Sequence, residues 1–272
     1  MSEASSEGQP LKTRSVQIGS LVVGGGRPCV IAGPCSVEAD YPDHAAQIAA
    51  CGVDGLRAGV YKPRTKPDSF QGMKERGLPL LIEARQRSGL PLIAEVMDQQ
   101  EAEQLFDLVD AFQIGARNMQ NYRLLEVLGD IGKPVVLKRG LAATIDEWVS
   151  ASEYLRHRGN HNVVLCERGI RTFEPRTRGT LDLSAVVVLR ELTDLPIIVD
   201  PSHAAGQRRW VPALARAALA VGADGILVEA HPEPTSAWSD ADQTIDLPTC
   251  QALVAQAVQI SEMSLSAIPV LA

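Results

Sequence analysis

Thiol, imidazole and carboxylate side chains follow apolar segments of the sequence and are the first candidates for chemistry. Cys35 follows the first of eight such segments, His203 follows the seventh, Glu229 ends the eighth, and Asp240 lies in the loop after it. A mixed sulfur, nitrogen and oxygen donor set suits a divalent transition metal (Mn, Fe, Co or Zn) rather than Mg. With an open coordination position, such an ion would act as a catalytic Lewis acid. The spacing alone leaves open that a histidine here, His231 above all, is only hydrogen-bonded.

Positively charged side chains also follow these segments, although the chain is acidic. Its formal charge is 26 − 33 = −7 and its isoelectric point is about 5.3. Several cations forced into one cleft repel each other unless an anion neutralises them, and arginine and lysine suit carboxylate and phosphate groups. Any one of these arginines and lysines could instead lie on a charged surface exposed to solvent. Lys138, however, ends an apolar segment and should point inward. We therefore predict a multiply anionic substrate held by the cations of Leu56–Pro67, Gln113–Asn121, Leu137–Gly140 and Cys166–Thr172.

These side chains need a scaffold, and short apolar segments alternate with longer amphipathic ones along almost the whole chain. Helical spacing is clear over Asp146–Arg158, with Trp148, Ala151, Tyr154 and Leu155 on one face, and over Arg208–Val221. We predict strands at Cys29–Ala32, Gly55–Ala58, Leu92–Glu95, Ala111–Ile114, Val135–Lys138, Val163–Cys166, Ile197–Val199 and Gly225–Glu229.

Alternating strands and helices predict an α/β fold with a parallel sheet. Eight units in about 250 residues match a closed (β/α)8 barrel, and a doubly wound open sheet is the alternative. The barrel is favoured because it brings all eight strand ends to one mouth, and polar residues stand at nearly every end. These are Cys35, Arg57, Glu95, Gln113, Lys138, Glu167, Asp200 and Glu229.

We expect one catalytic domain over residues 15–265 and no separate regulatory domain. Residues 1–14 are polar and are predicted to be a disordered leader. Ser15–Ile18 and Leu21–Val23 predict a β-hairpin (15–23), which we expect to cover the apolar N-terminal end of the barrel.

Composition excludes several classes of protein. A negative net charge argues against a general nucleic-acid-binding surface. No apolar run is long enough to span a membrane, and the N-terminus is not a secretory signal. The five cysteines form no C-x-x-C pair, which argues against a disulfide framework and indicates a reducing cytoplasm.

Several long strings in this sequence resemble one enzyme family, 3-deoxy-D-arabino-heptulosonate 7-phosphate (DAHP) synthase of the type Iβ branch. The resemblance covers residues 15–260. It rests on A-G-P-C-S-V-E (Ala32–Glu38), Y-K-P-R-T (Tyr61–Thr65), S-F-Q-G (Ser69–Gly72), Q-I-G-A-R-N-M-Q-N (Gln113–Asn121), L-K-R-G (Leu137–Gly140), L-C-E-R-G-I-R-T (Leu165–Thr172), D-P-S-H (Asp200–His203) and G-A-D-G (Gly222–Gly225).

The resemblance implies a (β/α)8 barrel that condenses phosphoenolpyruvate with erythrose 4-phosphate, the first step of the shikimate pathway and of aromatic amino acid biosynthesis. It also implies a homo-oligomer, dimer or tetramer. Matching the family's motifs implies metal ligands at Cys35, His203, Glu229 and Asp240. Phosphoenolpyruvate would be held by Arg57, Lys62, Arg117, Lys138 and Arg168, and the aldose phosphate by Arg64 and Thr65. The catalytic set would be Lys62, Lys138, Cys35 and His203.

Three alternatives stay open. The related 3-deoxy-D-manno-octulosonate 8-phosphate synthase typically reads K-A-N-R-S where this chain reads K-P-R-T (62–65), which favours the four-carbon aldose, although Lys66 and Asp68 depart from the DAHP synthase pattern. That departure leaves room for a different aldose phosphate in secondary metabolism. Lys138 as a Schiff-base lysine is a second alternative. A non-catalytic effector-binding barrel is the third, and the intact ligand and cation sets argue against it.

Overall fold

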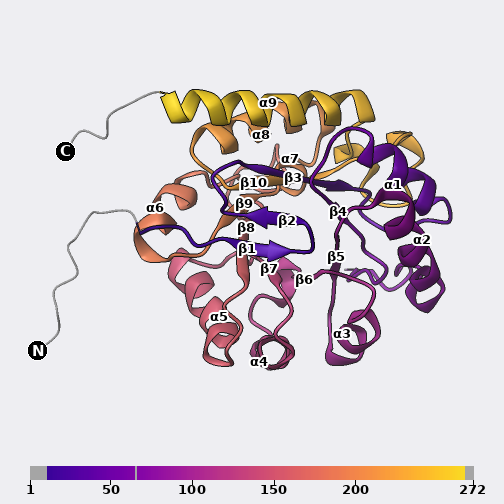
Figure 1. Cartoon of the computed structure of the whole chain (residues 1–272), viewed down its shortest axis with the longest axis horizontal. Coiled ribbons are helices and arrows are strands. Elements are labelled where there is room, and N and C mark those ends of the chain that lie inside the picture. The colour runs from indigo at the N-terminus through magenta and orange to yellow at the C-terminus, as the bar shows by residue number, and fades with distance from the viewer. Residues whose placement is uncertain (1–10, 65, 267–272) are drawn as a thin grey trace, which may run out of the picture.

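A closed barrel of eight parallel strands forms the centre of the molecule in a computed structural model, which describes residues 11–64 and 66–266 (Figure 1). The strands pair in chain order, and β10 closes the ring on β3. The (β/α)8 prediction is therefore confirmed and the open sheet is wrong. The strands are β3 (Cys29–Gly33), β4 (Gly55–Arg57), β5 (Leu92–Glu95), β6 (Ala111–Ile114), β7 (Val135–Lys138), β8 (Val163–Glu167), β9 (Ile197–Val199) and β10 (Gly225–Glu229).

Helices surround the barrel and bury their apolar faces on it. They are α1 (Tyr41–Ala49), α2 (Leu78–Ser88), α3 (Gln99–Leu105), α4 (Tyr122–Ile131), α5 (Ile145–His157), α6 (Ser184–Leu192), α7 (Pro201–Ala205), α8 (Val211–Ala220) and α9 (Leu247–Ser266). Short 3₁₀ turns lie at η1 (Lys74–Gly77), η2 (Ala116–Asn118), η3 (Arg208–Trp210), η4 (Pro234–Ser236) and η5 (Ala241–Gln243).

The two helices that the spacing predicted most clearly are present, with one side chain misplaced. Arg208–Val221 divides into η3 and α8, because Pro212 suits the first turn of a new helix. In α5 the side chains of Trp148 and Leu155 are buried, whereas Tyr154 is 39% exposed and stacks on Tyr122 of α4. The prediction that Tyr154 faces the core is wrong. Its ring is satisfied on the surface by another aromatic ring and leaves its hydroxyl in water.

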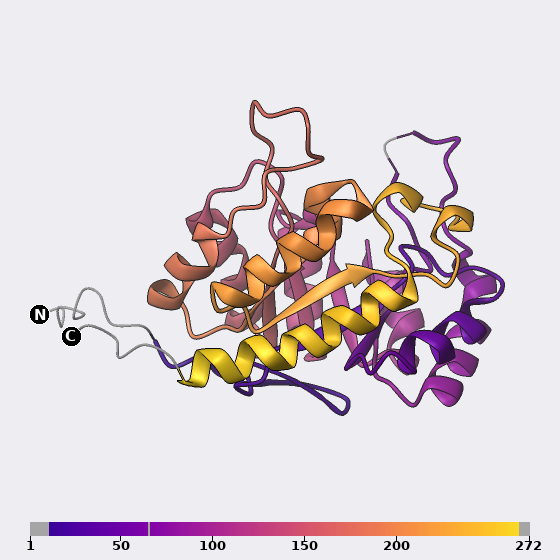
Figure 2. The same cartoon turned by 90° about the horizontal axis from the view of Figure 1, so that it is seen from above.

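A β-hairpin closes the N-terminal end of the barrel, as predicted. Strands β1 (Val16–Ile18) and β2 (Leu21–Val23) pair antiparallel, and their buried side chains form one cluster with interior residues of the barrel such as Ile93 and Leu227. Figure 2 shows this hairpin on the side opposite the long loops that follow the strands. The bottom of the barrel interior is thus filled with apolar side chains, and the cavity described below opens at the opposite end.

The segment just before the hairpin is bonded to the barrel. Leu11 N donates to Arg190 O at 2.7 Å, Arg14 N donates to Asp194 O at 2.8 Å, and the Arg14 guanidinium pairs with the Asp194 carboxylate. Residues 11–14 therefore differ from the disordered leader that we expected, because α6 offers them acceptors and a carboxylate. Residues 1–10 of that leader lie outside the described part of the chain.

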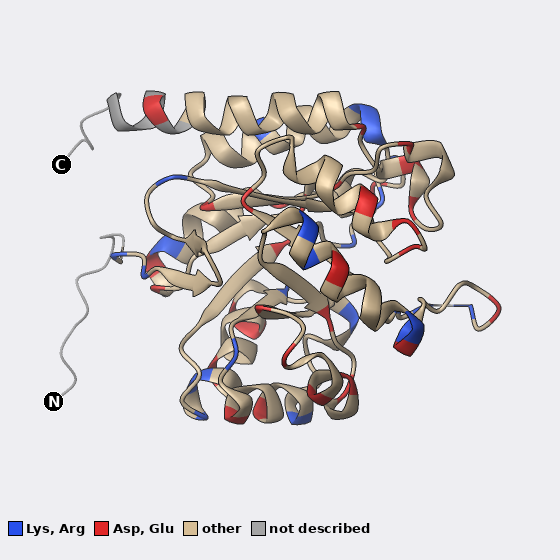
Figure 3. Cartoon of the chain, turned by 45° about the vertical axis from the view of Figure 1, so that its right-hand side comes forward, with Lys and Arg blue, Asp and Glu red and all other residues tan. Residues whose placement is uncertain are grey.

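Charges of both signs are spread over the helices and loops (Figure 3). Within the described residues, no helix combines the length and apolarity needed to cross a membrane.

Candidate active site

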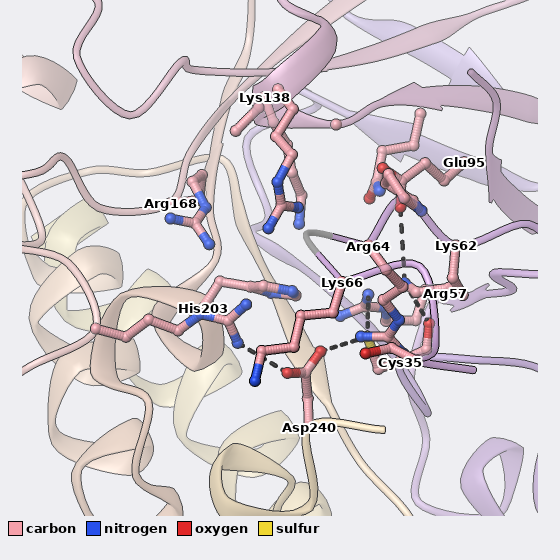
Figure 4. A pocket seen from close by; sticks show the side chains of 17 residues that line it. Cys35, Arg57, Lys62, Arg64, Lys66, Glu95, Lys138, Arg168, His203 and Asp240 are labelled. Atoms are coloured by element: carbon pink, nitrogen blue, oxygen red, sulfur yellow. Dashed lines mark hydrogen bonds and ion pairs between the residues drawn. The ribbon is translucent and has the colours of Figure 1, made fainter. Parts of the chain in front are cut away.

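A cavity of about 310 Å³ opens at the C-terminal ends of the barrel strands. Its wall holds most of the residues that the sequence marked as chemical, and Figure 4 shows them converging from β3, β4, β5, β7, β8 and the loops after them. The lining residues are Cys35, Arg57, Lys62, Pro63, Arg64, Lys66, Ser69, Glu95, Gln113, Gly115, Ala116, Arg117, Lys138, Arg168, Arg178, His203 and Asp240.

Four donor atoms of the expected metal site lie together at one side of this cavity. One ligand atom from each of Cys35, His203, Glu229 and Asp240 falls within 4.8 Å of the other three. Cys35 Sγ is 2.9 Å from Asp240 Oδ2, and His203 Nε2 is 3.4 Å from Glu229 Oε1. The structure thus brings together all four residues that the sequence nominated.

The remaining hydrogen bonds leave this set suited to a metal ion. Glu229 Oε1 is fully buried and lies 3.0 Å from the Arg57 guanidinium and 3.4 Å from His203 Nε2, so it is a charged oxygen within reach of the other donors. His203 Nδ1 is 2.7 Å from Asp200 Oδ2, which favours the proton on Nδ1 and leaves the Nε2 lone pair facing the other donors. One sulfur, one nitrogen and two carboxylate oxygens fit a divalent transition metal.

The local field holds two of these groups neutral in the absence of an ion. Burial, followed by the Glu229 charge, raises the pKa of the Cys35 thiol to about 12. Burial lowers the pKa of His203 to about 4, even though Asp200 and Glu229 oppose that shift. Asp240 is only partly buried, and its hydrogen bond from Cys35 and the Arg178 charge hold its pKa well below the usual range. Metal binding must therefore release the thiol proton, while the imidazole and carboxylates are already in ligating form.

A short helix aims His203 into the cavity. β9 ends at Val199, and the Asp200 carboxylate caps α7 by accepting from His203 N at 2.9 Å. Pro201 fits the first helical position because it needs no donor there. Gly206 then ends the helix in the left-handed region at φ 69°. The D-P-S-H string is thus a strand end, a cap and one helical turn.

Three of the expected cations are paired with carboxylates that stand at the ends of other strands. Lys138 Nζ lies 2.5 Å from Asp200 Oδ2, and Arg57 NH1 lies 3.0 Å from Glu229 Oε1. Lys62 Nζ lies 3.7 Å from Glu95 Oε2 and donates to the carbonyl of Cys35 at 2.8 Å. The idea that only a bound anion relieves the repulsion between these cations is therefore wrong for these three.

Two other arginines keep their charge available to a ligand. Among the residues that the structure describes, no carboxylate oxygen lies within 4.0 Å of a guanidinium nitrogen of Arg117 or Arg168. Arg168 is 6% exposed, and its burial lowers its pKa. A buried guanidinium without a carboxylate is unfavourable until an anion binds it. Both side chains line the cavity.

The cavity extends toward the loop that follows β4. Arg64, Lys66 and Ser69 line it there, and Arg64 Nε donates to the Phe70 carbonyl at 2.9 Å, which orients the guanidinium. Thr65, the second residue nominated for the aldose phosphate, lies outside the described residues.

Two cations of the predicted set do not line the cavity, since Arg171 is exposed and Arg139 is paired behind the wall, and two polar residues were missed. Arg139 bonds Glu167 at 3.1 Å and Asp182 at 2.8 Å, behind the wall. Arg178 lines the cavity and bonds Asp240, and Gln243 bonds Glu229. Arg178 lies in Thr177–Thr180 and Gln243 ends Asp240–Gln243, and neither segment directly follows a predicted strand, so residues at strand ends do not point to them.

A second cluster, Glu38, His44 and His231, is not arranged for a metal. His231 Nδ1 accepts from Glu233 N at 2.9 Å, so in the neutral ring the proton is on Nε2, facing Glu38 Oε2 at 3.4 Å. A protonated nitrogen offers no lone pair to an ion. His231 is hydrogen-bonded, which was the alternative left open by the sequence.

Known proteins similar to this chain share its barrel and most of its length. A phospho-2-dehydro-3-deoxyheptonate aldolase of Thermotoga maritima is 46% identical over 249 residues, covering 91% of this chain and 74% of that protein. A 2-dehydro-3-deoxyphosphooctonate aldolase of Rhodopseudomonas palustris is 30% identical over 88% of this chain and 90% of that protein.

Solved structures agree with these sequence comparisons. The crystal structure of the Thermotoga maritima DAHP synthase superposes with a TM-score of 0.89 at 45% identity, covering 93% of this chain and 75% of that one. A truncated form of the Thermotoga maritima synthase has a TM-score of 0.84 and is covered over 94% of its length. The sequence profile of the DAHP synthetase I family matches residues 9–266. The chain therefore belongs to the DAHP synthetase I family.

Proposed function

We propose that this chain condenses phosphoenolpyruvate, erythrose 4-phosphate and water to DAHP and phosphate, with the four-donor cluster holding a divalent transition metal. One observation supports this most directly: three of the four clustered S/N/O donors line the same cavity as two arginines that have no carboxylate partner in the described structure. Family membership and the 46% identity to the Thermotoga maritima enzyme point to the same reaction.

The cations would hold phosphoenolpyruvate in one orientation. Its carboxylate and phosphate need several positive charges, and we assign these to Arg117 and Arg168 first, with Arg57, Lys62 and Lys138 completing the set. Their hydrogen bonds fix the C2–C3 double bond relative to the aldehyde, which lowers the entropic part of the barrier. We assign the phosphate of the aldose to Arg64 and Thr65 of the loop after β4, with Lys66 beside them.

C3 of phosphoenolpyruvate is a weak nucleophile, so the aldehyde carbon must be electrophilic. A divalent metal bound by Cys35, His203, Glu229 and Asp240 would polarise the aldehyde carbonyl. When C3 forms the new C–C bond, positive charge develops at C2 and the C2 position takes up water. The hemiketal phosphate then breaks its C2–O bond and releases phosphate, whose negative charge the paired and unpaired cations stabilise.

Lys138 acts here as a bound cation rather than a Schiff-base amine. Its Nζ lies 2.5 Å from the Asp200 carboxylate, so the amine is already engaged in an ion pair. Borohydride added during turnover should therefore trap no substrate on Lys138, and a trapped adduct would establish the amine mechanism.

The test of the proposed function is phosphate release with a panel of aldose phosphates, before and after chelation. We expect preference for erythrose 4-phosphate over arabinose 5-phosphate, loss of turnover on chelation, and recovery with Mn²⁺, Fe²⁺, Co²⁺ or Zn²⁺. Cys35→Ser should fold and bind metal weakly. Full turnover after exhaustive chelation would reject the ligand assignment, and preference for a five-carbon aldose would reject the substrate. The oligomeric state (dimer or tetramer) and a cytoplasmic location stay predictions.

A further inference from the structure

The two carboxylates of the four-donor cluster are joined to each other by two side chains outside it. Arg178 NH1 donates to Asp240 Oδ1 at 2.9 Å and to Gln243 Oε1 at 2.8 Å. Gln243 Nε2 donates in turn to Glu229 Oε2 at 2.5 Å. A single chain of hydrogen bonds therefore runs from Asp240 through Arg178 and Gln243 to Glu229.

This chain of bonds occupies one oxygen of each carboxylate and leaves the other toward the cluster. Asp240 Oδ2 is the oxygen that meets Cys35 Sγ, and Glu229 Oε1 is the oxygen that faces His203 Nε2 at 3.4 Å and the Arg57 guanidinium at 3.0 Å. A carboxylate whose second oxygen is fixed cannot rotate away, so its first oxygen is held in ligating position before an ion arrives.

Arg178 comes from a different part of the chain and is itself anchored. It lies in the loop between β8 and α6, where the backbone N–H groups of Arg178 and Gly179 donate to the carbonyls of Ala205 and Ala204 at 3.4 and 2.9 Å. Those carbonyls belong to α7, the helix that carries His203. The anchor thus fixes Arg178 relative to the imidazole as well as to the carboxylates.

The turn that carries Asp240 needs such support. Asp240 adopts φ 54°, a left-handed conformation that L-residues other than glycine seldom adopt, and η5 follows directly. Gln243 N and the Thr244 hydroxyl donate to the Asp240 carbonyl at 3.2 and 2.9 Å. Gln243 is 2% exposed, so its side-chain bonds to Arg178 and Glu229 are shielded from water.

We infer that Arg178 and Gln243 are positioning residues that preorganise the Asp240 and Glu229 carboxylates for a divalent transition metal. This inference rests on the metal site of the proposed function. It makes the loop between β8 and α6 part of the metal site although no residue of that loop is a ligand. Outer partners of ligating carboxylates commonly change metal affinity by roughly 10- to 100-fold when removed.

Whether metal affinity rises or falls when Arg178 is replaced distinguishes a positioning role from a purely electrostatic one. Arg178 is a cation beside a cation site, so charge alone predicts that its removal tightens metal binding. Positioning predicts the reverse. An arginine that only contacted substrate would leave the metal affinity of the substrate-free protein unchanged.

The experiment titrates substrate-free, chelator-treated protein with Co²⁺, by calorimetry and by the thiolate-to-cobalt absorption band. Arg178→Met and Gln243→Leu should each weaken Co²⁺ binding roughly 10- to 100-fold and shift the band. The fold-loss of Co²⁺ affinity in the double variant should be smaller than the product of the two single-variant losses, because both side chains belong to one chain of hydrogen bonds. Arg176→Met, an exposed arginine in the same loop, is the charge-matched control and should bind as the unaltered protein does.

Unchanged or tighter binding in Arg178→Met overturns the inference, as does an equal loss in Arg176→Met. Circular dichroism checks each fold, and if Gln243→Leu does not fold, Arg178→Met decides alone because its side chain is 36% exposed. If the unaltered protein binds no Co²⁺, or Cys35→Ser keeps the thiolate band, the metal site of the proposed function fails first and this inference with it.

Discussion

Replacing Arg168 by methionine should remove activity without removing stability, an unusual combination for a buried residue. The guanidinium is 6% exposed, burial lowers its pKa, and it faces no carboxylate within ion-pair distance in the described structure. Its only hydrogen bond in the described structure is a long one, from NH1 to the Gly169 carbonyl at 3.5 Å. The protein without substrate therefore gains little from this charge.

The expected loss of kcat/KM in Arg168→Met comes from the contact that the guanidinium would make with bound phosphoenolpyruvate. Removing one member of a buried, charge-assisted contact to an anion costs about 2–5 kcal/mol. At about 1.4 kcal/mol per factor of ten, kcat/KM for phosphoenolpyruvate should fall at least roughly 30-fold. The free energy of unfolding should stay within about 1 kcal/mol of the parent value, because no buried ion pair is broken.

Lys138→Met supplies the contrast. It leaves the fully buried Asp200 carboxylate without its ammonium partner, so stability should fall by about 3–5 kcal/mol together with activity. Arg171→Met, an exposed arginine three residues after Arg168, should change neither quantity.

Initial rates of phosphate release at saturating aldose and metal measure the first effect. Urea unfolding of chelator-treated protein measures the second without a contribution from metal binding. If Arg168→Met kept kcat/KM within threefold, the assignment of an anion to this guanidinium would be refuted. If Arg168→Met lost as much stability as Lys138→Met, the unpaired state of its charge would be refuted.

Three further variants test other parts of the molecule. Lys66→Ser should change the ratio of kcat/KM between four- and five-carbon aldose phosphates while leaving KM for phosphoenolpyruvate unchanged, and an unchanged ratio would remove Lys66 from the aldose subsite. Ile18→Ala should cost about 2–5 kcal/mol of stability, measured by urea unfolding, with unchanged kcat/KM, since the hairpin packs at the end away from the cavity. Burial, with the charges of Asp98 and Glu95, raises the pKa of Glu101 from 4.5 to about 7, so the folded state holds this proton more tightly and the wild type loses stability as pH rises through that range. Glu101→Gln should therefore gain stability relative to the wild type between about pH 5 and about pH 8, and a pH-independent difference in their thermal midpoints would contradict this.

The strands were predictable because a parallel barrel buries both faces of every strand. Short continuous apolar runs such as Val135–Lys138 and Gly225–Glu229 are what such burial requires, and the structure has strands with these bounds. Residues that end the runs meet at one mouth, so sequence position alone nominated Lys138 and Glu229. Helix bounds moved by a residue or two, because caps such as Thr144 depend on side-chain hydrogen bonds.

Side-chain contacts between loops that are far apart in the sequence could not be predicted from the sequence in this way. Arg178 and Asp240 are 62 positions apart, and neither stands in a run whose period reveals its direction. The same limit applies to Arg139. It directly follows Lys138, the last residue of β7, but its side chain points away from the cavity, toward Glu167 and Asp182. Successive residues of a strand alternate sides, and only the closed barrel decides which side is the cavity.

The charge balance of the cavity explains how an acidic chain can bind a doubly anionic substrate. Lys62, Lys138 and Arg57 are matched by strand-end carboxylates, so they contribute geometry more than net charge. Arg117 and Arg168 have no carboxylate partner in the described structure, so each adds positive charge to the cavity. Salt screens exposed charges over a length of about 8–10 Å, so exposed carboxylates on the outer helices oppose a substrate in the mouth only weakly. The affinity for anions should accordingly follow these two arginines and change little when the net charge of the helices is altered.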